Sequence, residues 1–99
     1  MHKKNIVHRD IKPENIFVDS NMNLKVGDFG VSKLLENNDQ SFKTQTGTPY
    51  YIAPEMYKDT KYTHKVDFWS LGCVLYELCA LERPFVPKNN NMMMHFQQL

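Results

Sequence analysis

The segment from Val66 to Leu81 is the one long apolar element of this 99-residue chain. Apolar side chains recur on all of its faces, and only Asp67 and Glu77 carry charge within it. A helix that is apolar all round belongs at the centre of a core, with protein on every side. The other apolar runs of the chain are short and few, so they supply too few partners to wrap this helix. We therefore expect these residues to form part of a larger domain.

The remaining pattern predicts a mainly helical α+β fold with a small β-hairpin and a long loop. Two short β-type runs at 16–18 and 24–26 flank a spacer of turn residues, which predicts the hairpin. From residue 28 to residue 54 the chain is polar and has few periodic apolar positions, and a loop of that length is usually functional. The proline at 54 favours the start of a short helix.

Charge and apolar patterning exclude several classes of function. The formal net charge is +1, which gives no electrostatic support for a nucleic-acid partner. No stretch approaches the roughly 20 apolar residues that a membrane span requires, so we expect no membrane partner. Cys73 and Cys79 lie six positions apart in the predicted helix, about 9 Å along its axis, which is too far for a disulfide. We therefore expect a cytoplasmic protein with reduced thiols, with nuclear or cytoskeletal association left open.

Four short motifs follow one another in a specific order. The sequence HRDIKPEN occupies residues 8–15, DFG residues 28–30, APE residues 53–55 and DFWSLG residues 67–72. Each motif alone would mean little, but their order and spacing together form a specific signal. The sequence resembles the catalytic domain of eukaryotic serine/threonine protein kinases over residues 1–86. It is most similar to the NIMA-related kinases, through GTPYY at 47–51 and GCVLYEL at 72–78.

This resemblance implies a fragment of the C-terminal lobe of a kinase domain, without the N-terminal lobe and its Gly-rich loop. It divides the chain into a catalytic loop and hairpin at 6–27, an activation segment at 28–55, an F-helix at 65–81, and a loop with the start of the G-helix at 87–99. We expect such a truncated chain, whether a biological product or an artefact of its gene model, to be inactive alone.

The resemblance implies ATP and Mg²⁺ as cofactors. Asp10 would orient the substrate hydroxyl and accept its proton, and Lys12 would place a positive charge against the γ-phosphate. Asn15 and Asp28 would supply the oxygen ligands that Mg²⁺ demands. Glu14 is implied at the nucleotide site as well.

Phe17 resembles the residue that packs beneath the adenine ring, with Val74 and Leu78 below it. A structural role is implied for six further residues, which are His8, Phe29, Gly30, Glu55, Asp67 and Trp69. Of these, His8 would pack with Phe29 and transfer no proton, and Asp67 would be a buried carboxylate that accepts backbone N–H groups from the catalytic loop.

Two further expectations concern partners of single side chains. Glu55 is expected to lack its arginine partner, which in the family lies beyond position 99. The remaining histidines show no ligand spacing and are expected at the surface; they are His2, His64 and His95.

Regulation is implied for Arg9 and three threonines. Arg9 would pair with a phosphate that an activating kinase places on the activation segment, and Thr44 and Thr46 are the candidates to carry it. Thr48 would bond to Asp10 and Lys12 and select protein substrates that present serine or threonine.

Two hypotheses therefore stand. One is a serine/threonine protein kinase, a transferase whose activity belongs to the parent protein. The alternative is a non-catalytic, kinase-derived interaction fragment.

Overall fold

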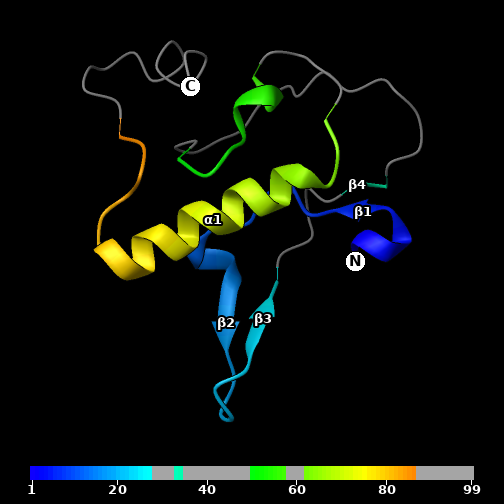
Figure 1. The fold of residues 1–99 in the computed structure, drawn as a ribbon. Helices are drawn as coiled ribbons and strands as arrows, with labels where there is room; N and C mark the ends of the chain where they lie inside the picture. The colour runs from blue at the N-terminus through cyan, green and yellow to red at the C-terminus, as the bar shows by residue number, and fades with distance from the viewer. Residues whose placement is uncertain (28–32, 35–49, 58–61, 87–99) are drawn as a thin grey trace.

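Helix α1 (Lys65–Ala80) runs across the middle of the molecule (Figure 1). The computed structural model describes residues 1–27, 33–34, 50–57 and 62–86. The helix predicted from the apolar run is present and ends at Ala80, because Leu81 adopts a left-handed conformation with φ 57°. The Leu81 N–H donates to the Glu77 carbonyl oxygen at 2.8 Å, which satisfies one of the last carbonyl groups of the helix.

The described residues cover only one side of α1. The buried side chains of the helix are Val66, Asp67, Ser70, Cys73 and Val74. On other faces Phe68 is 58% exposed, Leu75 62% and Leu78 67%. The helix is therefore apolar all round but packed on one side by this part of the chain, as the shortage of apolar partners in the sequence predicts.

Two small clusters of buried side chains lie along the packed side of α1. One contains Val7, Ala53, Met56 and Val66, and the other contains Ile11, Tyr51, Cys73 and Val74. Trp69 packs against both clusters, and its ring stacks on Phe85 with centroids 5.4 Å apart. Trp69 thus joins the chain that leaves the end of α1 to the two clusters.

Strands β2 (Ile16–Val18) and β3 (Leu24–Val26) form the predicted antiparallel hairpin, with Ile16 opposite Val26. The hairpin projects away from α1 (Figure 1). At its tip the Asp19 carboxylate accepts the backbone N–H groups of Asn21 and Asn23, both at 2.9 Å. This side-chain bonding is the reason why the Asp19–Asn23 spacer turns the chain.

A second strand pair was not predicted. Strand β1 (Ile6–Val7) pairs in an antiparallel manner with β4 (Lys33–Leu34), inside the region expected to be a loop. Two-residue strands are too short to show alternation, so this pairing depends on the path of the chain.

Three short 3₁₀ turns complete the described structure. They are η1 (His2–Lys4), η2 (Pro13–Asn15) and η3 (Pro54–Met56). Proline occupies the first position of the last two turns, where its missing N–H costs no hydrogen bond, and η3 is the short helix predicted at residue 54.

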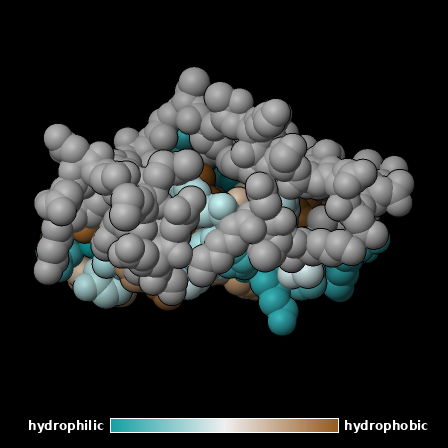
Figure 2. All heavy atoms as spheres, turned by 90° about the horizontal axis from the view of Figure 1, so that it is seen from above, coloured by the Kyte–Doolittle hydropathy of each residue, from teal (hydrophilic) through white to brown (hydrophobic). Residues whose placement is uncertain are grey.

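Seen from above, hydrophobic and hydrophilic residues of the described part lie side by side (Figure 2). Within that part no helix combines the length and the apolar character needed to cross a bilayer. Cys73 is buried and Cys79 is exposed, and both are free thiols.

Candidate active site

A buried carboxylate joins α1 to the loop at residues 8–10. The side chain of Asp67 is 2% exposed. Its Oδ2 accepts the backbone N–H of His8 and its Oδ1 accepts that of Arg9, both at 2.9 Å. Asp67 lies in the first turn of α1, where the helix dipole favours a negative charge. The Asp67 carboxylate of α1 therefore fixes the backbone of this loop by two hydrogen bonds.

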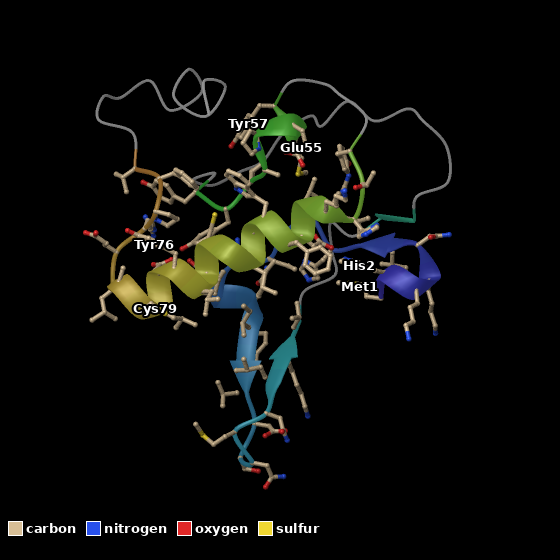
Figure 3. The ribbon with its side chains drawn as sticks, viewed as in Figure 1. Met1, His2, Glu55, Tyr57, Tyr76 and Cys79 are labelled. Carbon is tan, nitrogen blue, oxygen red and sulfur yellow. The ribbon has the colours of Figure 1, made fainter. Side chains whose placement is uncertain are left out.

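His2 is a further partner of Asp67, which the sequence did not reveal. Its Nε2 lies 2.7 Å from Asp67 Oδ2, and its side chain is only 25% exposed. The ring lies 5.0 Å from that of His64 and 5.4 Å from that of Phe68, beside the first turns of α1 (Figure 3). The expectation of a surface position was therefore wrong for His2, because its partner is 65 positions away in sequence. His64 is exposed, as expected.

Arg9 has an unusual backbone conformation, with φ 68°. A residue with a Cβ adopts this left-handed region only when its surroundings hold it there. The Asp67 carboxylate does so at the backbone N–H, and the Tyr62 hydroxyl contacts the guanidinium Nη1 at 3.0 Å.

His8 is completely buried, and its two ring nitrogens bond to the backbone. The Asp10 N–H donates to His8 Nδ1 at 3.2 Å, so the ring hydrogen lies on Nε2, which donates to the Gly27 carbonyl oxygen at 2.8 Å. The ring thus ties the loop to the residue that follows β3. Neither nitrogen faces a substrate proton in this arrangement. The implied partner Phe29 lies outside the described residues.

Two polar side chains, those of Asn15 and Lys12, converge on Asp10. Asn15 Nδ2 donates to the Asp10 backbone carbonyl at 2.7 Å and to Asp10 Oδ2 at 3.0 Å. Lys12 Nζ lies 3.6 Å from Asp10 Oδ1. Asn15 is buried, and its backbone carbonyl oxygen accepts the Gly27 N–H at 2.8 Å. The Asp10 carboxylate is consequently oriented from both of its oxygens, while 23% of the side chain stays exposed.

The chemistry of Asn15 fits a magnesium ligand. Its side-chain amide nitrogen donates to Asp10, so the side-chain amide oxygen is the atom that could bind a cation. An uncharged hard oxygen is a donor that Mg²⁺ accepts. Within 1–27, 50–57 and 62–86 no group of three His, Cys, Asp or Glu side chains is placed to hold a metal ion. The second implied ligand, Asp28, lies outside those ranges.

The side chains implied at the nucleotide form no cluster like the one around Asp10. Phe17 is 55% exposed, and its ring lies so close to Gly27 that a Cβ on that glycine would come within 2.7 Å of Phe17 Cε2. Glu14 is exposed in η2. Val74 is buried in the cluster with Ile11, whereas Leu78 is 67% exposed on α1.

Several implied site residues lie outside the part of the chain that the structure describes. They are Asp28, Phe29, Gly30, Thr44, Thr46 and Thr48, together with His95 in the segment 87–99.

The segment 50–57 packs above α1 and carries Glu55 and Tyr57 (Figure 3). Glu55 takes part in an interaction in the structure. The expectation about its arginine partner concerns a residue beyond position 99 and stays a prediction. Nearby, the Tyr51 hydroxyl donates to Glu77 Oε2. Burial, together with this carboxylate, raises the pKa of Tyr51 to about 12. The Ser70 hydroxyl donates to the Tyr51 carbonyl oxygen at 2.6 Å, which fixes the same segment to α1 a second time.

Comparison with known proteins adds an independent finding. Residues 1–99 match the family described as protein kinase domain. The mouse serine/threonine-protein kinase Nek2 is 55% identical over 85 residues, which is 85% of this chain and 19% of that protein. The human serine/threonine-protein kinase Nek5 is 50% identical over 90 residues, 90% of this chain and 13% of that protein. The G2-specific protein kinase fin1 of Schizosaccharomyces pombe is 51% identical over 83 residues, 84% of this chain and 12% of that protein. The chain thus spans less than a fifth of the length of each of these relatives.

Proposed function

The chain belongs to the protein kinase family and is similar to its NIMA-related members, and we propose that it provides the catalytic loop of a serine/threonine protein kinase. The reaction is transfer of the γ-phosphoryl group of ATP to a serine or threonine hydroxyl of a protein. The observation that carries the proposal is the convergence of Lys12 and Asn15 on the Asp10 carboxylate.

Asp10 is the proposed proton acceptor. The hydroxyl oxygen of the substrate forms a bond to the γ-phosphorus, the bond from that phosphorus to the β-γ bridging oxygen breaks, and the hydroxyl proton passes to the Asp10 carboxylate. Because Asn15 and Lys12 contact different oxygens of that carboxylate, its plane is set before substrate arrives. Such positioning is the main contribution that a protein makes to phosphoryl transfer.

Lys12 and Asn15 have second roles in this proposal. Magnesium-bound ATP supplies the phosphoryl group and an ADP leaving group, with Asn15 and Asp28 as the residues that would hold the metal. The Lys12 ammonium group, 37% exposed and within 4 Å of Asp10, offers its positive charge to the transferring phosphate. Glu14 and Phe17 are proposed to border the nucleotide.

Regulation is proposed to act through Arg9. An activating kinase would phosphorylate Thr44 or Thr46, and the guanidinium of Arg9 would bind the added phosphate by charge-assisted hydrogen bonds. Thr48 is proposed to bond to Asp10 and Lys12. We also propose that residues 28–55 form the activation segment and that the protein is cytoplasmic.

The test is a phosphoryl-transfer assay with radiolabelled ATP, Mg²⁺ and serine- and threonine-containing peptides. It compares the intact protein with its Asp10→Asn variant, which we expect to lower kcat by at least about a hundredfold. Asp19→Asn is the matched control, because Asp19 is a carboxylate at the hairpin tip that also accepts backbone N–H groups. Unchanged turnover in Asp10→Asn would contradict the proposal, as would equal losses in both variants.

We propose that the 99 residues alone are inactive, because their sequence contains no Gly-rich loop to cover the ATP phosphates. The same assay on this chain by itself tests that statement. Phosphorylation that the chain catalyses and that Asp10→Asn abolishes would contradict it.

A non-catalytic interaction fragment is the second candidate. It is favoured by the exposed apolar side chains of α1, since Leu75 is 62% and Leu78 67% exposed. Surfaces of this kind are usually covered by protein. A chain that binds a kinase or its substrate, with a loss of binding in Leu75→Ser but not in Asp10→Asn, would favour this function over catalysis.

A further inference from the structure

Tyr62 lies between the apolar cluster at the start of α1 and the loop that carries Asp10. Its ring packs against the cluster formed by Val7, Ala53, Met56 and Val66. Its hydroxyl oxygen accepts a hydrogen bond from Arg9 Nη1 at 3.0 Å, across 53 positions of sequence. None of the motifs that identify the family includes this residue.

The segment from Tyr62 to Asp67 therefore holds Arg9 at two points. The Asp67 carboxylate binds the Arg9 backbone N–H at 2.9 Å, and the Tyr62 hydroxyl binds the guanidinium. The first contact maintains the left-handed backbone of Arg9, which sets the direction in which its side chain leaves the loop. The second contact sets the plane of the guanidinium at the other end of a long, flexible side chain.

The chemistry of the second contact is suited to an arginine that has to bind an anion. A phenol hydroxyl is uncharged at neutral pH, so it orients the guanidinium without neutralising it. A carboxylate in the same place would compete with a phosphate for the charge. Because Tyr62 is packed against this buried apolar cluster, its hydroxyl has little freedom to move.

We propose that Tyr62 is a positioning residue for Arg9, whose hydroxyl orients the guanidinium to receive the activating phosphate. The inference rests on the proposed function, in which that phosphate is carried by Thr44 or Thr46. It adds a residue of the segment before α1 to those that control how Arg9 binds the phosphate.

The test uses Tyr62→Phe, which removes one oxygen and keeps the packed ring. The matched control is Tyr76→Phe, which removes the same atom from a tyrosine that is 48% exposed on α1. Phosphothreonine is installed at position 44 or 46 of the intact protein, and the gain in unfolding temperature on phosphorylation is measured for each variant. A second measurement follows the rotation of the Arg9 guanidinium by ¹⁵N relaxation, with the signal assigned through Arg9→Gln.

We expect Tyr62→Phe to lose about half or more of the gain in unfolding temperature, since one hydrogen bond to a charged group is removed. We also expect faster rotation of the Arg9 guanidinium in this variant. Tyr76→Phe should keep the wild-type gain and the wild-type rotation. A merely structural role of Tyr62 would lower the unfolding temperature of both phosphorylation states equally and leave the gain intact, which would overturn the inference.

The outcomes separate this inference from the proposed function. If Arg9→Gln abolishes the gain while Tyr62→Phe retains it, the inference about Tyr62 is wrong and the role of Arg9 stands. If Arg9→Gln retains the gain, the phosphate does not bind Arg9 and both statements about regulation are wrong. Neither the unfolding temperature nor the Arg9 relaxation requires catalysis. Unchanged turnover in Asp10→Asn would therefore contradict the proposed function without bearing on Tyr62.

Discussion

The Asp67 carboxylate offers the most direct test of how α1 supports the loop at residues 8–10. Asp67→Asn preserves the size of the side chain but replaces one acceptor oxygen by an NH₂ group. The two backbone N–H groups of His8 and Arg9 each require an acceptor at 2.9 Å, and His2 Nε2 lies 2.7 Å from the same side chain. An asparagine can serve one of the two backbone groups, and its own NH₂ then faces the other as a second donor.

The expected loss of stability follows from these contacts. A hydrogen bond to a charged group contributes about 1.5–3 kcal/mol, and a buried N–H left without an acceptor costs a further amount of about 1–3 kcal/mol. The midpoint of their sum is about 4 kcal/mol. We therefore expect Asp67→Asn to lower the free energy of unfolding by about 3–5 kcal/mol.

The assay is urea unfolding followed by the fluorescence of Trp69, the single tryptophan, which packs against both apolar clusters. Asp19→Asn is again the control, because the Asp19 carboxylate also accepts two backbone N–H groups at 2.9 Å but lies at the exposed hairpin tip. Water replaces a lost acceptor there, so we expect little change. A variant of Asp67 that fails to fold while Asp19→Asn folds gives a lower limit to the loss. Equal stability of the two variants would refute the reasoning.

Three other predictions test the packing around the site. Burial raises the pKa of Tyr51 to about 12, so its phenol should ionise about two pH units above an exposed tyrosine. The stability that the protonated phenol provides should therefore be lost between about pH 10 and pH 12, and difference absorbance of wild type against Tyr51→Phe checks this. Gly27→Ala should displace the Phe17 ring, because the new Cβ would lie 2.7 Å from it. The free energy of unfolding should fall by about 1 kcal/mol or less, since Phe17 is 55% exposed and its ring can move away. The expected NMR result is a shift of the Phe17 ring signals without unfolding. Cys79 should react with a thiol reagent at once and Cys73 only on unfolding, since burial shields the Cys73 thiol and raises its pKa. Rapid reaction of two thiols per chain under native conditions would contradict this.

Local features of the structure could be predicted from neighbouring residues alone. The apolar run starting at Val66 predicted α1, because the run contains no proline and carries apolar side chains on every face of a helix. The Asp19–Asn23 spacer predicted the hairpin, because asparagine and aspartate bond to their own backbone and turn it. The order and spacing of the four motifs also indicated the family, which the comparison with known proteins shows.

Contacts between distant residues were decided by the tertiary structure. The pairing of β1 with β4 and the contact of His2 with Asp67 join segments whose own residues show no periodicity that would predict them. The contact of Tyr62 with Arg9 likewise spans 53 positions. Such contacts depend on where the folded chain brings its segments together, and a two-residue strand or a single histidine carries too little local information to specify that. The sequence by itself determined which elements form and which motifs they carry, whereas the tertiary structure determined which side chains hold those motifs in place.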